Sequence, residues 1–95
     1  MNAKAMPLAK FRLGHIVTTP SALSQLTQED ILMGIGRHQA GDWGDVSNEG
    51  RTANDRALAD GTRIWSAYHA ASGAVFWVIT EADRRTTTIL LPGEY

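Results

Sequence analysis

The sequence predicts an α+β fold, in which a short N-terminal strand and two to three helices pack on a C-terminal three-stranded antiparallel meander. β-Branched and aromatic residues form three runs in the last third of the chain, at 62–69, 74–81 and 86–91. Turn-forming residues separate these runs, at 71–73 and 83–85. Helical patterns precede the runs, and helices followed by consecutive strands are typical of α+β domains.

The first two helices are predicted from their start signals. Thr19 precedes Pro20, as an N-cap precedes a proline in the first helical position, and a short helix is expected through Leu26. Thr27 precedes two acidic residues in the same way, so a second helix should begin there and end near Gln39.

A third helix and an early strand complete the expected order. Ser47 is a suitable cap for a helix running to about Asp60, with Thr52 as an alternative start and Gly61 as its end. Residues 11–17 alternate weakly, which indicates a short strand that pairs with an edge of the meander.

The run at 74–81 is apolar on both faces, which is typical of a central strand. If Trp77 and Ile79 form an exposed patch, a symmetric partner is expected, so a homodimer is one hypothesis. The predicted core combines strand residues with helix residues: Ile64, Trp65, Phe76, Val78, Ile89 and Leu91 with Leu26, Ile31, Leu32 and Ile35.

Length and composition limit the function classes. The 95 residues suffice for one domain, expected at residues 11–95, with residues 1–10 as a flexible arm. A formal charge of −1 disfavours non-specific nucleic-acid binding. The chain has no cysteine and no apolar run long enough for a secretory signal or a membrane span, so we expect a cytoplasmic protein.

The segment Gly41–Asp45 is the least generic part of the chain, because it places Trp43 between the carboxylates of Asp42 and Asp45. His38 precedes it near the end of the second helix, and together these residues form the leading candidate binding site. The alternative is structural, with the carboxylates bonding to backbone amides and Trp43 filling the core. The spacing matches no metal motif, and we expect neither a metal nor a cofactor.

Asn54 is the other candidate binding residue. It lies four residues before Leu58 and therefore on the same helical face, which predicts a buried or interfacial amide with a specific hydrogen-bonding role.

A catalytic alternative uses residues of the meander. His69 and Glu81 would transfer protons and Arg63 would stabilise developing phosphate charge in a metal-independent ribonuclease. Arg63 and His69 lie on one face of their strand, but six residues at about 3.3 Å each place their Cα atoms about 20 Å apart. This mechanism therefore requires both side chains to lean toward each other.

Two resemblances bear on function. The order of a strand, helices and a meander resembles that of barnase and RelE-like nucleases, which implies a His, Glu, Arg or Lys constellation on the sheet. Segments 13–20, 41–45, 78–83 and 87–92 are similar to small uncharacterised proteins of plasmids and other mobile elements. This similarity implies a family without an established activity.

The sequence contains no recognised catalytic motif. The leading hypothesis is thus a small non-catalytic binding or accessory protein of a mobile genetic element, with an unknown protein partner. The alternative is the ribonuclease.

Overall fold

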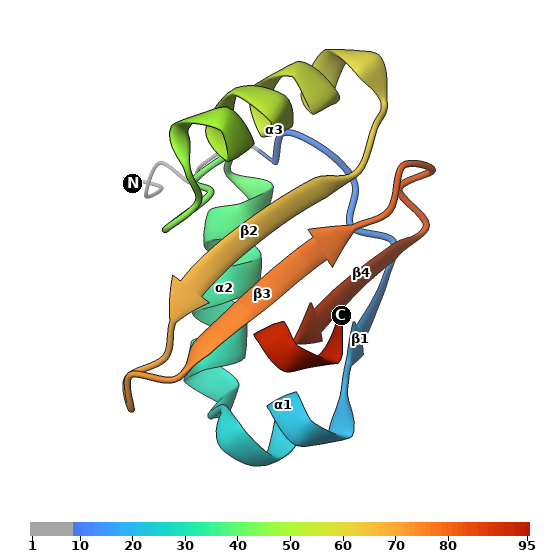
Figure 1. Ribbon diagram of the computed structural model, residues 1–95. Coiled ribbons are helices and arrows are strands. Elements are labelled where there is room, and N and C mark those ends of the chain that lie inside the picture. The colour runs from blue at the N-terminus through green and yellow to red at the C-terminus, as the bar shows by residue number, and fades with distance from the viewer. Residues whose placement is uncertain (1–8) are drawn as a thin grey trace, which may run out of the picture.

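The computed structural model describes residues 9–95 and confirms the predicted α+β class (Figure 1). The elements follow the order β1 (His15–Thr18), α1 (Pro20–Gln25), α2 (Gln28–Gln39), α3 (Asn48–Asp60), β2 (Ile64–His69), β3 (Val75–Thr80), β4 (Thr86–Leu90) and the short 3-10 helix η1 (Pro92–Glu94). Most of the expected N-terminal arm, residues 1–8, lies outside the described residues. Lys10 is bound to the end of α2, because its backbone N–H donates a hydrogen bond to the Gln39 carbonyl at 2.9 Å.

The four strands form one mixed sheet in the order β1-β4-β3-β2. The meander is confirmed, since β3 lies between β2 and β4 and is antiparallel to both. The early strand also pairs with the meander, and it runs parallel to β4 with His15 opposite Thr86. It is shorter than predicted: Gly14 has a φ of 65°, and a Cβ there would overlap the Arg85 carbonyl, so regular pairing begins only at His15.

The predicted helix ends are confirmed at atomic detail. The Thr19 side chain accepts from the N–H of Ala22, and the Ser47 side chain accepts from the N–H of Gly50. Thr27 forms a complete capping box with Asp30. Gly61 ends α3 in the left-handed conformation, with a φ of 73°.

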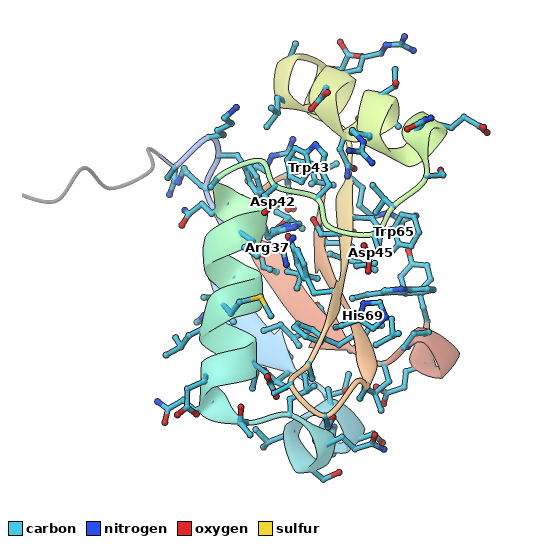
Figure 2. The ribbon with its side chains drawn as sticks, turned by 90° about the vertical axis from the view of Figure 1, so that its left-hand side faces the viewer. Arg37, Asp42, Trp43, Asp45, Trp65 and His69 are labelled. Carbon is cyan, nitrogen blue, oxygen red and sulfur yellow. The ribbon has the colours of Figure 1, made fainter. Side chains whose placement is uncertain are left out.

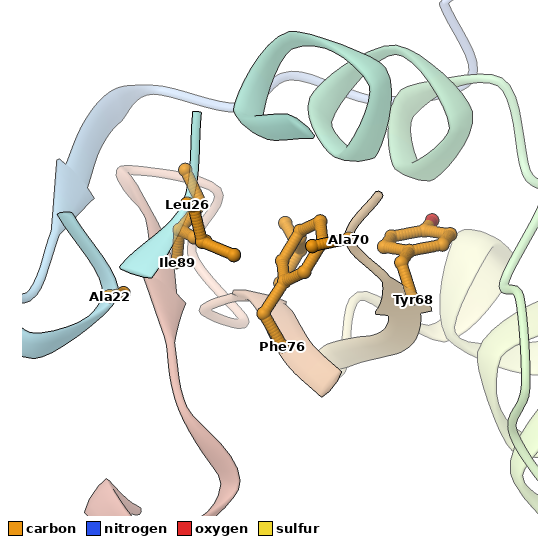
Figure 3. Close-up of a cluster of buried hydrophobic side chains, with 7 residues drawn as sticks. Ala22, Leu26, Tyr68, Ala70, Phe76 and Ile89 are labelled. Carbon is orange, nitrogen blue, oxygen red and sulfur yellow. The ribbon is translucent and has the colours of Figure 1, made fainter. Parts of the chain in front are cut away.

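The main core lies between α1, α2 and one face of the sheet, which we call the inner face (Figure 3). Its fully buried strand residues include Tyr68, Phe76 and Ile89, against which Ala22 and Leu26 pack. These large side chains alternate along their strands with residues of the opposite, outer face, as the period of two requires.

The prediction that Leu32 belongs to the core is wrong, because its side chain is 60% exposed. The buried stripe of α2 instead contains Gly34 and His38, with Ile31 and Ile35 partly buried beside it. Gly34 is needed there, since a Cβ at this position would lie 2.7 Å from the Phe76 ring. A stripe with this helical spacing leaves Leu32 on the solvent side.

No helix within residues 9–95 is long and apolar enough to cross a membrane.

Candidate functional site

Trp43, the central residue of the predicted binding loop, lies in the core. Its side chain is 4% exposed, and its indole N–H donates to the Asp55 carboxylate at 2.9 Å. Its ring packs against those of Phe11 and His38, at centroid distances of 6.2 and 6.0 Å. These contacts belong to the structural alternative, in which Trp43 fills the core.

The loop backbone extends the sheet beyond β2 (Figure 2). Ala67 donates its N–H to the Trp43 carbonyl at 3.2 Å and accepts from the N–H of Asp45 at 2.8 Å. The Tyr68 hydroxyl donates to the Asp42 carbonyl at 2.6 Å. The loop is therefore held to β2 by its main chain.

Both carboxylates of the loop are paired within the chain (Figure 2). Asp42 accepts from Nε and Nη2 of Arg37 at 2.7 and 3.1 Å, and this contact lowers the pKa of Asp42 and raises that of Arg37. Asp45 lies 2.7 Å from His69 Nδ1. Both pairs are exposed, so each contributes roughly 1 kcal/mol or less.

His38 is fully buried and belongs to a chain of hydrogen bonds that crosses the sheet. The Thr87 hydroxyl donates to the Leu13 carbonyl at 2.8 Å, so it must accept from Thr80 at 2.7 Å. Because the Thr80 hydroxyl already donates its proton to Thr87, it must accept from Nε2–H of His38 at 2.8 Å. Nδ1 remains as an acceptor for Ser66 at 2.6 Å, which fixes one neutral tautomer.

The pair of Ser66 and His38 has the spacing of a nucleophile and its base, but its surroundings exclude that role. Both residues are 0% exposed. Burial, with a smaller effect of the Arg84 charge, lowers the pKa of His38 to about 3. His38 is therefore a weak base and is out of reach of a ligand.

Asn54 has the buried hydrogen-bonding role that its position predicted. It is 3% exposed, its amide donates to the Trp65 carbonyl at 2.6 Å, and its carbonyl accepts from the Trp65 N–H at 3.1 Å. The side chain thus pairs with the β2 backbone where a further strand would bind.

The structure does not bring the proposed ribonuclease residues together. Arg63 and Glu81 flank the paired residues Ile64 and Thr80, at one end of the sheet. His69 pairs with Val75 at the other end and contacts Asp45. Five residues of strand, or about 16 Å, lie between these two ends.

Metal ligands do not gather either. Within residues 9–95, no group of three or more His, Asp or Glu side chains is placed to hold a metal ion. His38, Asp42 and Asp45, the trio with the most suggestive spacing, each bind a different partner in the chain.

An aromatic hollow opens on the outer face of the sheet. We call it the aromatic groove; its volume is about 230 Å³, and it is lined by Arg63, Trp65, Trp77, Ile79 and Tyr95. Trp65 and Trp77 meet edge to face at 5.1 Å, and Tyr95 lies 6.3 Å from Trp77. The Arg63 guanidinium stacks on the Tyr95 ring at 5.0 Å.

One of the residues that line the groove has a polar group without a partner. The indole N–H of Trp65 is buried and finds no acceptor among the described residues. Leaving such a donor unpaired costs about 1–3 kcal/mol, so it calls for an explanation.

Strand alternation places Trp65 and Trp77 on one face, since Ala67 pairs with Trp77 and Trp65 with Ile79. That signal was present in the sequence. The sequence carried no such signal for Tyr95, because Tyr95 reaches the groove only through long-range contacts of η1 and the C-terminus with β3.

No protein-family model matches the sequence, and comparisons with curated proteins and with solved structures find no significant match.

Proposed function

We propose that this chain is a small non-catalytic binding protein that recognises a segment of another protein through the aromatic groove. The observation that carries the proposal is the groove itself, in which the aromatic side chains of Trp65, Trp77 and Tyr95 and the guanidinium of Arg63 surround a hollow. Aromatic and arginine side chains are the residues that most often dominate binding energy at protein interfaces.

The size of the groove favours one side chain as its occupant. Pockets for drug-sized ligands usually measure about 300–1,000 Å³. A hollow of about 230 Å³ is smaller, and its lining is mostly apolar, with Arg63 as its one charged side chain. An aromatic or large aliphatic side chain of a protein partner matches this volume and this lining.

One charged group defines the polar part of the ligand. Arg63 supplies a positive charge beside the aromatic rings, which suits a carboxylate. We therefore infer a partner segment that combines an apolar anchor with an acidic residue.

The loop Gly41–Asp45 is less suited to this role than the sequence indicated. Its aromatic ring is core, its main chain is bonded to β2, and its carboxylates are paired within the chain. The similarity of the sequence to proteins of plasmids and other mobile elements supports an accessory role in such an element, as part of the same proposal.

The test is selection of peptides from a random library displayed on phage, using the full chain as the target. We expect enriched peptides that share an aromatic or large aliphatic residue near an acidic one. Trp77→Ser should weaken their binding about 30-fold, since losing a central aromatic anchor costs roughly 2 kcal/mol or more. Arg63→Gln should weaken the peptides that carry the acidic residue.

Val75→Ser is the matched control, because Val75 lies on the same strand and the same face but outside the groove. It should leave affinity unchanged. Peptides that bind Trp77→Ser as tightly as the parent chain would contradict the proposal, and so would the absence of any enrichment.

A further inference from the structure

The two edges of the sheet differ in how their backbone groups are covered. At the β2 edge, the Asn54 side chain pairs with the N–H and C=O of Trp65, and the loop pairs with those of Ala67. Edge strands expose hydrogen-bonding groups that promote association, and covering them prevents it. This edge is therefore closed to further strands.

The opposite edge, β1, has no comparable cover. His15 and Thr19 donate their N–H groups to carbonyls of Arg85 and Ile89 on the β4 side. Because successive residues of a strand point their backbone groups in opposite directions, Ile16 and Thr18 direct theirs away from β4. The side chains of Ile16 and Val17 are 48% and 47% exposed.

The residues of β1 also lack the usual protection of an edge. Within His15–Thr18 there is no lysine, proline or bulge. Instead, exposed β-branched side chains lie on both faces of a strand that ends the sheet (Figure 1). Such a strand is suited to pairing with another one.

We propose that a second copy of this chain binds at β1, so that two β1 strands pair antiparallel about a two-fold axis at Ile16. In this register, the outward backbone N–H and C=O groups of Ile16 lie opposite the C=O and N–H groups of the partner's Ile16. The outward backbone groups of Thr18 lie opposite those near Gly14. It also covers the exposed Ile16 and Val17 side chains. The result is a continuous eight-stranded sheet across two copies.

The charges at the two ends of β1 favour this antiparallel arrangement. The start of β1 is surrounded mainly by basic side chains, those of Arg12, His15, Arg84 and Arg85, with one acidic residue, Asp83. At its other end, Glu94 accepts a hydrogen bond from the Thr19 hydroxyl at 2.7 Å. With Ile16 opposite Ile16 in an antiparallel pair, the start of β1 in each copy lies beside the end of β1 in the other, so the basic end of one strand faces the acidic end of the other.

A four-residue strand covers much less than the roughly 1,200 Å² of a standard stable interface, so the dimer should be reversible and depend on concentration. Sedimentation velocity of the full chain over a concentration series should show a monomer–dimer equilibrium. Ile16→Lys should abolish the dimer, because it places two like charges directly opposite each other. The matched control is Leu32→Lys, because Leu32 is also an exposed apolar residue and lies on α2, away from β1. This variant should retain the dimer.

Cross-linking tests the register itself. The chain has no cysteine, so Ile16→Cys introduces a single thiol. Directly opposed residues in a hydrogen-bonded antiparallel pair have Cα atoms about 5.5 Å apart, which is within the range for a disulfide. Under mild oxidation, Ile16→Cys should form a covalent dimer much faster than Leu32→Cys.

A parent chain that stays monomeric at high concentration, with equal cross-linking rates for the two cysteine variants, would overturn the proposal. A dimer that Ile16→Lys leaves intact would overturn it as well. Neither outcome depends on the aromatic groove, since no residue of the groove belongs to β1.

Discussion

His38 and Trp43 pack against each other inside the molecule, with their ring centroids 6.0 Å apart. Both are core residues, and their partners are distant: His38 bonds to Ser66 and Thr80, which are 28 and 42 residues away. Core packing of Trp43 was one of the two readings of the sequence, but local sequence carries no signal for the distant partners of His38, so its burial could not be predicted.

The buried His38 predicts a pH dependence of stability. Its pKa is about 3 in the folded chain and about 6.5 when unfolded, so the unfolded state binds more protons below pH 6.5. The free energy of unfolding should therefore fall as the pH drops, by about 2 kcal/mol between about pH 7 and about pH 5. Urea unfolding at a series of pH values measures this loss.

His38→Gln is the control for that experiment, because an amide can still donate toward Thr80 and accept from Ser66 without titrating. Its stability should be nearly constant over the same interval. The depressed pKa values of Asp30, Asp42 and Glu94 also make the fold less stable in acid, but that loss begins only as the pH falls toward their ordinary values near 4. An equal slope in parent and variant would show that His38 is not the titrating group.

Secondary structure elements were largely predictable because their signals are local. The caps at Thr19, Thr27 and Ser47, the stop at Gly61 and the meander all follow from neighbouring residues. The parallel pairing of β1 with β4 joins strands about 70 residues apart in sequence. Its direction depends on the path of the whole chain, so only the existence of a pairing with an edge of the meander was predictable.

Asn54 links α3 to the exposed edge of β2, and its removal should destabilise the fold. Asn54→Ala leaves the buried N–H and C=O of Trp65 without partners, which costs about 1–3 kcal/mol in free energy of unfolding. Arg56→Ala, an exposed change on the same helix, should alter it by about 0.5 kcal/mol or less. Chemical denaturation of both variants makes the comparison, and equal losses would refute the assigned role of Asn54.

At the scale of the whole molecule, the two faces and the edges of the sheet differ in what covers them. The inner face of the sheet packs against the helices to form the core, and the outer face carries the aromatic groove. The β2 edge is closed by the loop and by Asn54. The candidate site was predictable only in part, because strand alternation places Trp65 and Trp77 together, whereas Tyr95 joins them through the fold of the C-terminus.

The central claim is that ligands bind at the aromatic groove and not at the loop. The three tryptophans provide a direct test, since each indole N–H gives its own signal in a ¹H–¹⁵N spectrum of the full chain and Trp43 reports on the loop. The probe is N-acetyl-L-phenylalanine, which combines an aromatic ring, a carbonyl and a carboxylate. N-Acetyl-L-alanine, which lacks the ring, is the control.

On titration with the phenylalanine derivative, the Trp65 and Trp77 signals should shift, because the aromatic ring of the probe packs against both indoles, while the Trp43 signal stays fixed. The alanine derivative should shift none of them. A shift of Trp43 with Trp65 and Trp77 unchanged, or no shift at millimolar probe, would contradict the account.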